Sequence, residues 1–568
     1  MKDGHGMKAK LVDVIVAGSG SAGMTTAVVA AKLGLDVLLV EKTRYFGGTT
    51  ALSGGGAWIP NNHQMDSMGA SDTADAAMLY LEAVVGNWLR QDLAQAFLAQ
   101  GPEMMDFMLA NTAVQMIVRH GPDYFPDRPG GSQGGRAFTP VLFDGRELGS
   151  DLSRLRPPLE QFNSPWGMMI NMADIQHAMA AKRSPKSAWY MAKLFAQYGV
   201  ERMRYGRGAR LTMGNALAGR LLKSALDAGV ELWSESPIVD LVKEGGRVAG
   251  AVIEHDGVNL RVLARRGVVL ATGGFSASEE MRRKYYASAE RTMTLVPPGN
   301  TGDGIALAQR AGAAMVERNA DNGVWIMMSR YTKPDGSVMP IPRILNFGRP
   351  GVILVDRNGQ RFANEATLFV AQKMREIGLP SGWAICDHRF VRKWGLGNIL
   401  PTGIRLRRMV RQGYVQRAPT LEMLARQIGI DPAGLGATIA ATNAAAREGR
   451  GDQMGKGEGG FDRYLGDPAN KPHPNLGAIE SGPFYALEVF PGDITSTLGL
   501  QVSASGRVLA VTGVPIDGLF ACGLDMNSIW SGLAPANGAN NGANMTFGYI
   551  IARTLAEEAP RPVGMAVA

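Results

Sequence analysis

A glycine-rich turn near the start of the chain constrains the fold more than any other feature. Residues 12–23 read VDVIVAGSGSAG, a hydrophobic strand that passes directly into a helix. Gly18, Gly20 and Gly23 have the spacing G-x-G-x-x-G, which allows a tight turn, close approach of a pyrophosphate, and packing of the helix on the sheet. Free N–H groups at the helix N-terminus favour an anion there. The stretch therefore predicts a strand–helix–strand unit that binds a dinucleotide.

The residues that follow complete this unit. A helical stretch, 21–33, precedes the apolar run 36–40. Glu41 comes next, about 20 residues beyond the glycines, where a carboxylate would bind ribose hydroxyls. The segment 47–56 is dense in glycine, serine and threonine, which offer hydrogen bonds without side-chain bulk. We therefore expect a planar cofactor ring to lie against this main chain.

A second glycine turn lies far along the chain. Residues 230–242 and 248–254 are typical of strands, and the buried strand 267–275 ends in the turn ATGG. Combined with the first turn, this pattern indicates a flavin-type Rossmann domain. Residues 298–305 then open a helix, where Asp303 could cap the helix or accept a hydrogen bond from a ligand.

The last glycine-rich blocks, 518–525 and 537–549, are predicted to contact the same ligand as the first two glycine turns. A strand ending in glycine and an apolar helix that runs to about Ala556 would place another helix N-terminus there. Such a terminus can stabilise negative charge on a reduced flavin ring. Residues 291–479 carry instead a mixture of short strands, turns and helices, which predicts a separate inserted domain.

The composition narrows the class of protein. The 568 residues carry a net charge of +8 and a pI near 9.4, but Lys and Arg are scattered apart from the cluster 202–210, which disfavours nucleic acid as a partner. Two distant cysteines, Cys386 and Cys522, give neither a disulfide framework nor a metal-ligand spacing. The first eleven residues lack an apolar region of signal-peptide length. We therefore expect a cytoplasmic protein without a metal site.

The sequence contains no run of 18 or more apolar residues, so it predicts no membrane span. The segment 189–210 combines basic residues with apolar and aromatic ones, as in an interfacial helix: Trp189, Tyr190, Met191, Leu194, Phe195 and Tyr198. Such a stripe more often packs against the protein's own core. Peripheral membrane contact is therefore the weaker of the two interpretations.

Eight motifs occur in the order typical of one family of flavoproteins. They read GSGSAG, EKTRYFGGTTALSGGGAWIPNN, DYFPDRPGG, ATGGF, PPGNTGDG, GQRFANEA, GPFYALEVFPGD and MTFGY. Over nearly its whole length the chain resembles 3-ketosteroid dehydrogenases and, more distantly, fumarate reductase flavoprotein subunits. The resemblance implies FAD as the cofactor. The bond to FAD would be non-covalent, because no histidine lies between Glu41 and Asn62.

The motifs and the resemblance together give the candidate FAD contacts. Most lie in the glycine-rich turns and the segments beside them. The set is Gly18, Ser19, Gly20, Ser21, Ala22, Gly23, Glu41, Lys42, Gly48, Thr49, Thr50, Ser53, Gly54, Gly55, Val239, Ala271, Thr272, Gly273, Asn300, Asp303, Gly523, Asp525, Gly538 and Asn541.

The predicted fold class is α/β, a Rossmann-type FAD-binding domain with an inserted α+β capping domain. Residues 1–290 and 480–568 would form the FAD-binding domain, with a mostly helical excursion over 61–214. Residues 291–479 would form the capping domain, which covers the cofactor and completes the substrate pocket.

The resemblance also implies a mechanism. In 3-ketosteroid dehydrogenases a tyrosine hydroxyl and a backbone N–H polarise the substrate ketone, a basic residue removes the α-proton, and the β-hydrogen leaves as hydride to the flavin. Tyr124 matches one tyrosine of the family by its DYFP context, on a loop rich in proline and glycine. Gly538 would supply the backbone N–H. The tyrosine that binds the ketone is absent, because Ala534 stands at its position.

The proton-abstracting tyrosine of the family also has no counterpart. It precedes a turn that resembles Arg349-Pro350-Gly351, where this chain has Pro342-Arg343-Ile344. Tyr331 is therefore the candidate to replace it, and Arg343 or Tyr331 is the candidate for the polar anchor of the substrate. The histidine and arginine of the fumarate reductases are likewise absent, from 494–497 and 536–538.

Three functions fit this sequence. The leading hypothesis is an FAD-dependent dehydrogenase that introduces or reduces a C=C bond beside the carbonyl of a hydrophobic cyclic ketone. The second is an ene-reductase or desaturase in which Arg343 grips a substrate carboxylate, and the third is a flavin-binding protein without turnover. No second nucleotide fingerprint is evident, so we expect an external electron acceptor such as a quinone or another redox partner.

Overall fold

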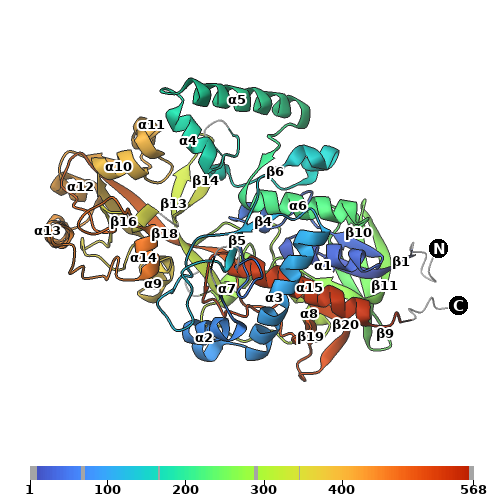
Figure 1. Cartoon of the computed structure of the whole chain (residues 1–568). Helices are drawn as coiled ribbons and strands as arrows, with labels where there is room; N and C mark the ends of the chain where they lie inside the picture. The colour runs from blue at the N-terminus through green and yellow to red at the C-terminus, as the bar shows by residue number, and fades with distance from the viewer. Residues whose placement is uncertain are drawn as a thin grey trace.

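The computed structural model describes residues 9–65, 69, 71–163, 167–286, 292–343 and 346–561. An eight-stranded and a seven-stranded sheet dominate this part of the chain and occupy different regions of the molecule (Figure 1). Helices pack around both sheets. The predicted α/β class, a Rossmann-type domain with an additional α+β unit, is confirmed.

The larger sheet is the Rossmann sheet. Its central strands run in the order β20-β11-β1-β2-β8, and the pairs from β20 to β8 are parallel. Such strands are buried on both faces, which explains their continuous apolar runs. The strands are β1 (Ala9–Ala17), β2 (Val37–Val40), β8 (Glu231–Trp233), β9 (Ile238–Glu244), β10 (Arg247–His255), β11 (Val258–Leu270), β19 (Arg507–Leu509) and β20 (Pro515–Ala521).

Two helices from opposite ends of the chain pack together beside this sheet. Helix α1 (Ser21–Lys32) follows the first glycine turn directly, and α15 (Ala539–Glu557) follows the last one. Gly548 allows their close contact, because a Cβ there would lie 2.7 Å from the carbonyl oxygen of Ala22. This packing brings the two ends of the sequence to one place.

The predicted strand 230–242 is interrupted. The structure has β8 and β9 there, with Glu235 in the left-handed region at φ 53° and Pro237 in the connection. A proline has no N–H to donate to a sheet. The chain therefore turns at this point, and β8 pairs with β2 whereas β9 pairs with β10.

The chain between β2 and β8 contains both helices and short strands. Its helices are α2 (Ala74–Val85), α3 (Gln91–Asn111), α4 (Met172–Ala180), α5 (Pro185–Tyr205) and α6 (Met213–Asp227). Its strands are β3 (Ala57–Trp58), β4 (Met116–Val118), β5 (Ala137–Pro140), β6 (Phe143–Asp144) and β7 (Arg210–Leu211).

The second sheet is built around the long strand β18 (Phe484–Ser496), which pairs with β13, β16, β12 and β17. The other strands are β12 (Met293–Thr294), β13 (Gly323–Thr332), β14 (Val338–Arg343), β15 (Val352–Val355), β16 (Gly382–Asp387) and β17 (Gln416–Ala418). Because β18 lies beyond residue 480, this sheet extends past the predicted domain boundary. The division into domains itself stays a prediction.

The remaining helices pack on both sheets, those within 279–310 on the core around the first and those within 370–448 on the cores around the second. They are α7 (Glu279–Tyr285), α8 (Asp303–Arg310), α9 (Val370–Glu376), α10 (His388–Trp394), α11 (Leu406–Arg411), α12 (Leu421–Ile428), α13 (Pro432–Glu448) and α14 (Gly460–Leu465). An ion pair between Arg282 of α7 and Asp493 of β18, at 2.5 Å, is almost fully buried between them. It joins the segment after the ATGG turn to the second sheet.

Candidate active site

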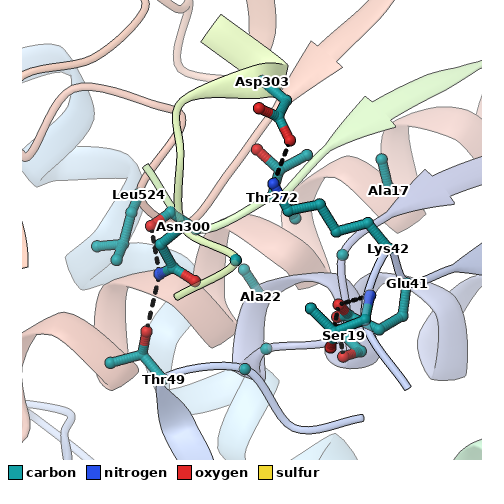
Figure 2. Close-up of a pocket in the computed structure, with 18 of the residues that line it drawn as sticks. Ala17, Ser19, Ala22, Glu41, Lys42, Thr49, Thr272, Asn300, Asp303 and Leu524 are labelled. Atoms are coloured by element: carbon teal, nitrogen blue, oxygen red, sulfur yellow. Dashed lines mark hydrogen bonds and ion pairs between the residues drawn. The ribbon is translucent and has the colours of Figure 1, made fainter. Parts of the chain in front are cut away.

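A cleft opens where three adjacent parallel strands end. The carboxyl ends of β1, β2 and β11 contribute Ala17, Val40 and Ala271 to its wall, of which Figure 2 labels Ala17. Ligands of open α/β sheets bind at this edge, next to helix N-termini. The cleft lies beside the N-terminus of α1.

The three glycines of the first turn have different surroundings. A Cβ at Gly18, where φ is +105°, would lie 2.1 Å from the carbonyl oxygen of Ala271, and one at Gly23 would lie 2.0 Å from that of Gly18. The nearest atom to a Cβ at Gly20 is the Thr50 hydroxyl, 3.8 Å away. Gly18 and Gly23 are therefore needed for packing, whereas Gly20 borders open space of the kind a pyrophosphate fills.

Glu41 is buried and held in one orientation at the end of β2. Its carboxylate accepts hydrogen bonds from the Ser19 hydroxyl at 2.5 Å and from the Thr43 N–H and hydroxyl, each at 2.9 Å (Figure 2). The carboxylate is therefore positioned before any ligand arrives. This is the geometry expected of a group that binds ribose hydroxyls.

Lys42 spans the cleft to the first residue of α8. Its ammonium forms an ion pair with Asp303 (Figure 2) and also donates a 2.5 Å hydrogen bond to the Thr301 hydroxyl. Of the two roles expected for Asp303, that of helix cap is wrong, because Gly302, at φ 85°, is the N-cap residue of α8 and no side chain caps the helix. Asp303 instead acts as an acceptor on the cleft wall.

Asn300 ties together two walls of the cleft. Its amide donates to the carbonyl oxygen of Gly273 at 2.7 Å and to the Thr49 hydroxyl at 3.0 Å (Figure 2). The ATGG turn and the segment after β2 are thereby held at a fixed separation.

Asp525 lies behind the cleft rather than in it. Its buried carboxylate accepts hydrogen bonds from the Thr272 N–H at 2.5 Å, the Thr272 hydroxyl at 2.9 Å and the Gly274 N–H at 3.2 Å. Burial raises the pKa of Asp525 to about 6. The side chain therefore supports the ATGG turn from behind and does not line the cleft.

The cleft contains 16 of the candidate FAD contacts. They are Gly18, Ser19, Gly20, Ser21, Ala22, Glu41, Lys42, Gly48, Thr49, Thr50, Ala271, Thr272, Gly273, Asn300, Asp303 and Gly523. Candidates that do not line it are Gly23, Ser53, Gly54, Gly55, Val239, Asp525, Gly538 and Asn541. The side chain of Val239 is 44% exposed, because the break before β9 turns Pro237 and Ile238 toward the cleft instead.

Sequence reasoning missed several lining residues, among them Thr43, Arg156, Ser236 and Asn544. Arg156 comes from the helical excursion, and its guanidinium donates to the Thr43 hydroxyl at 2.9 Å. Burial lowers the pKa of Arg156, and one of its buried nitrogens, Nε, finds no hydrogen-bond partner among the described residues. No motif marks an arginine that reaches the site from so far along the chain.

A small cavity continues the cleft toward α15. It shares Gly523, Leu524 and Asn544 with the cleft and is also lined by Ser496, Thr497, Trp530, Asn540 and Phe547. The indole N–H of Trp530 is buried without a hydrogen-bond partner in the described part of the chain. The cleft therefore extends to the N-terminal turn of α15.

Gly538 starts α15 in the left-handed region, at φ 86°. A Cβ there would lie 2.5 Å from the backbone of Gly56, and the Gly538 carbonyl accepts from the Trp58 N–H at 3.0 Å. The last glycine block is thereby fixed against the segment that follows the first one. Only glycine fits this position.

Tyr124 lies on the loop next to the Ala534–Gly538 segment, as its N–H donates a 3.1 Å hydrogen bond to the carbonyl oxygen of Pro535. Its ring makes edge contacts with Phe461 and Phe369, at centroid distances of 5.1 and 6.3 Å. The three aromatic rings line a cavity of about 250 Å³ together with Asn364, Thr367 and Asp462. Burial raises the pKa of the Tyr124 phenol, which keeps it protonated at neutral pH.

The other two candidate catalytic residues lie in the second sheet. Tyr331 is buried in the core around this sheet, where its hydroxyl donates to the Gln412 side chain at 3.3 Å and its ring contacts Tyr414. It lines neither the cleft nor the Tyr124 cavity. Arg343 ends β14, where its backbone is opposite Met327, and its side chain is outside the described part of the chain.

Comparison with known proteins identifies the class. The sequence profile described as FAD binding domain matches residues 13–540. The chain is 36% identical to 4-oxocyclohex-2-ene-1-carboxylate 5-dehydrogenase of Sinomonas cyclohexanicum, over 96% of this chain and 93% of the relative. It is 35% identical to 3-oxosteroid 1-dehydrogenase of Mycobacterium tuberculosis, over 96% of this chain and 98% of the relative.

A solved structure agrees with this result. The 3-ketosteroid Δ1-dehydrogenase of Sterolibacterium denitrificans, in complex with 1,4-androstadiene-3,17-dione, superposes with a TM-score of 0.86 at 34% identity and covers 96% of this chain and 99% of its own. A flavocytochrome c3 fumarate reductase, at 20% identity and a TM-score of 0.62, shares the fold.

The chain belongs to the FAD-binding flavoprotein family of the 3-ketosteroid dehydrogenases. It is an FAD-dependent dehydrogenase that acts on CH–CH groups. The open space at Gly20, the fixed Glu41 carboxylate and the helix N-terminus fit the pyrophosphate and ribose of FAD. None of the described helices has the length and hydropathy of a membrane span, and the described residues form no cluster of metal-ligating side chains.

Proposed function

We propose that this protein desaturates a small cyclohexanone that carries a carboxylate, by introducing a C=C bond next to the ketone. The observation that carries the proposal is Ala534, a half-buried alanine beside the Tyr124 loop where the resemblance places the tyrosine that holds a steroid ketone. Two relatives, a 4-oxocyclohex-2-ene-1-carboxylate dehydrogenase and a 4-oxocyclohexanecarboxylate dehydrogenase, support this choice of substrate class.

FAD, when bound, accepts the hydride that leaves the β-carbon. The residues of the chain bind and polarise the ketone and handle the α-proton. The Gly538 region offers N–H groups at the start of α15, where the helix dipole stabilises a developing oxyanion. The Tyr124 phenol, protonated because of its raised pKa, is suited to donate a hydrogen bond or to relay a proton.

Because this tyrosine is absent, the substrate ketone accepts one hydrogen bond fewer. Loss of such a donor costs on the order of 3 kcal/mol of transition-state stabilisation. An anchor at the other end of the substrate would offset this loss by holding the ring in place. Arg343 is our candidate for that anchor, because a guanidinium binds a carboxylate through two parallel hydrogen bonds.

Electrons would then pass to an external acceptor, such as a quinone or another redox partner, in the cytoplasm. The absence of a second nucleotide fingerprint from the sequence supports this part of the proposal.

The test follows flavin absorbance of the purified protein without oxygen, after addition of one substrate at a time. We expect 4-oxocyclohexane-1-carboxylate to bleach the flavin rapidly, with 4-methylcyclohexanone and androst-4-ene-3,17-dione at least tenfold slower, since each lacks the carboxylate contact. The two neutral ketones are matched controls for ring and carbonyl. Rapid bleaching by the steroid and none by the carboxylate would contradict the proposal.

A further inference from the structure

Removal of the α-proton requires a base, and none of the residues discussed so far is suited to this role. The proton-abstracting tyrosine that the resemblance implies has no counterpart in this chain. Tyr331, its candidate replacement, is buried in the core around the second sheet and lines neither the cleft nor the Tyr124 cavity. The Tyr124 phenol is protonated at neutral pH, because burial raises its pKa. A base is therefore needed that lies close to Tyr124 and carries a negative charge.

The cavity beside Tyr124 has a buried carboxylate in its wall. Of the two acidic residues that line it, Asp462 is only 7% exposed, whereas Asp127 is exposed at the surface. Asp462 lies in the first turn of α14, directly after Phe461, whose ring contacts that of Tyr124. At about 250 Å³, the cavity is close in size to the smallest ligand pockets of proteins, about 300 Å³. It therefore has room for a small cyclic ketone beside this carboxylate.

The two carboxylate oxygens of Asp462 have different surroundings. Oδ2 accepts hydrogen bonds from the Asn364 amide at 2.7 Å and from the Gly457 N–H at 3.1 Å. Oδ1 accepts none from the described residues. A carboxylate that is held through one oxygen keeps the other available to take a proton from a ligand in the cavity.

A buried network of charges fastens the segment that carries Asp462. Arg361, in the motif GQRFANEA, pairs with Glu365 at 2.7 Å and with Asp452. The buried ammonium of Lys456 lies 3.7 Å from Glu365. These two cations face two carboxylates, and Asp462 forms no ion pair with any described cation. The network therefore fixes the position of Asp462 without pairing its charge.

We propose that Asp462 is the base that removes the α-proton. The C–H bond at the α-carbon breaks, its proton passes to Oδ1, and its electron pair becomes the second bond of the new C=C. The β-hydrogen leaves with its own electron pair, which reduces the flavin. The inference rests on desaturation next to a ketone and does not depend on the carboxylate preference proposed above.

The surroundings of Asp462 suit this role. Burial raises the pKa of its carboxyl, whereas the hydrogen bonds from Asn364 and Gly457 and the Lys456 ammonium lower it. A carboxylate with a raised pKa is a better proton acceptor. The cavity thus contains a protonated phenol, Tyr124, as donor and an ionised carboxyl as acceptor, the combination that desaturation next to a ketone requires.

The test compares the holoenzyme with Asp462→Asn, using whichever of the three ketones named above bleaches the flavin fastest. The asparagine oxygen can still accept from Asn364 and Gly457, so FAD content and circular dichroism should match the wild type. We expect the rate of flavin reduction in stopped flow to fall at least about 100-fold. The matched control is Glu458→Gln, an exposed carboxyl in the same loop that does not line the cavity, and it should reduce within about twofold of the wild type.

The pH profile separates a base from a structural role. The wild-type rate should rise with pH through the raised pKa of Asp462 and then level off, because only the ionised carboxyl accepts a proton. Asp462→Asn should lack this rise, and Asp462→Glu, which keeps a carboxylate, should retain it. The other ionisable groups that face Asp462 remain in both variants, namely Lys456 and Glu365 in the network and Tyr124, Asp127 and Arg128 in the cavity wall.

A second readout does not involve the flavin reduction step. Holoenzyme whose flavin has been reduced beforehand cannot oxidise the ketone, but in D2O its base should still exchange the α-protons of the ketone for deuterium, as mass spectrometry would show. Asp462→Asn should exchange them at least about 100-fold more slowly. Flavin reduction within tenfold of the wild type, an unchanged pH profile or wild-type exchange in this variant would overturn the proposal, as would a wild type that does not exchange.

Discussion

The hydroxyl of Tyr80 donates a 2.6 Å hydrogen bond to the carbonyl oxygen of Pro535. The same hydroxyl accepts from the Phe125 N–H at 3.3 Å, and the Pro535 carbonyl also accepts from the Tyr124 N–H. Tyr80 is buried on α2 and thus joins the Tyr124 loop to the segment that carries Gly538. This phenol therefore helps to fix the relative position of two candidate catalytic groups, Tyr124 and Gly538.

Tyr80→Phe should therefore slow flavin reduction without removing FAD. The change leaves the partly buried Phe125 N–H without the Tyr80 hydroxyl as its acceptor, which costs about 1 kcal/mol of unfolding free energy. We expect a tenfold or greater loss in the rate of flavin reduction in stopped flow, with little change in KM. Tyr205→Phe, far from this loop on α5, is the control and should behave as wild type. An unchanged reduction rate would show that the Tyr124 loop needs no such support.

Substitution of Gly20 and substitution of Gly23 should have different effects on the protein. Gly20→Val should give a folded apoprotein without flavin, because its Cβ meets no protein atom closer than 3.8 Å but enters the space for the pyrophosphate. Gly23→Val should not fold, because its Cβ would lie 2.0 Å from a carbonyl oxygen. Circular dichroism and flavin absorbance of the purified variants distinguish the two. A Gly20→Val protein with full flavin content would refute the phosphate site.

These glycines also mark the limit of what the sequence could predict. Their spacing is local, so it identified the turn, the helix after it and Glu41. The contacts that fix the cleft join residues more than 250 positions apart, as in Lys42 with Asp303, Asn300 with Thr49, and Thr272 with Asp525. No local pattern records such pairs.

Two further candidate residues, Val239 and Tyr331, lie outside the cleft for different reasons. Val239 lies one residue beyond the last lining residue of this segment, Ile238, because Pro237 interrupts the predicted strand and turns the chain. Tyr331 is a candidate by position in the sequence alone, and tertiary packing directs its side chain into the core of the second sheet. Gly538 and Tyr124, identified by motif, lie on adjacent loops.

Tyr124→Phe should slow flavin reduction by about two to four orders of magnitude, the usual contribution of a positioned acid or base. FAD content should not change, since Tyr124 does not line the cleft. Tyr464→Phe is a matched control, because that tyrosine is 44% exposed and its hydroxyl accepts a hydrogen bond from Arg119 at the surface. Equal reduction rates for the Tyr124 variant and the wild type would remove this phenol from the mechanism.

Asp525 should make the stability of the apoprotein depend on pH. Its pKa is about 6 in the folded protein, above the ordinary 3.8. The folded state therefore holds this proton more tightly, so the contribution to stability is complete below about pH 4 and is lost as the pH rises through about 6. The loss amounts to about 3 kcal/mol.

Asp525→Asn cannot ionise and should lack this dependence. In urea unfolding of both apoproteins, the free energy of unfolding of the wild type minus that of the variant should fall between about pH 4 and about pH 7. A difference that is constant or rises over this range would mean that the carboxyl is already ionised in the folded protein at low pH.

Arg343→Lys should abolish a preference for carboxylate substrates. Lysine keeps the charge but loses the planar fork that forms two parallel hydrogen bonds with a carboxylate. We expect kcat/KM for 4-oxocyclohexane-1-carboxylate to fall tenfold or more, while kcat/KM for 4-methylcyclohexanone stays within about twofold, because the neutral ketone never made the contact. Arg330→Lys, on the adjacent strand β13 with an exposed side chain stacked on Phe490, should affect neither substrate. If the Arg343 variant loses the same factor with both ketones, the arginine supports the fold of the pocket and the carboxylate anchor must be sought on another residue.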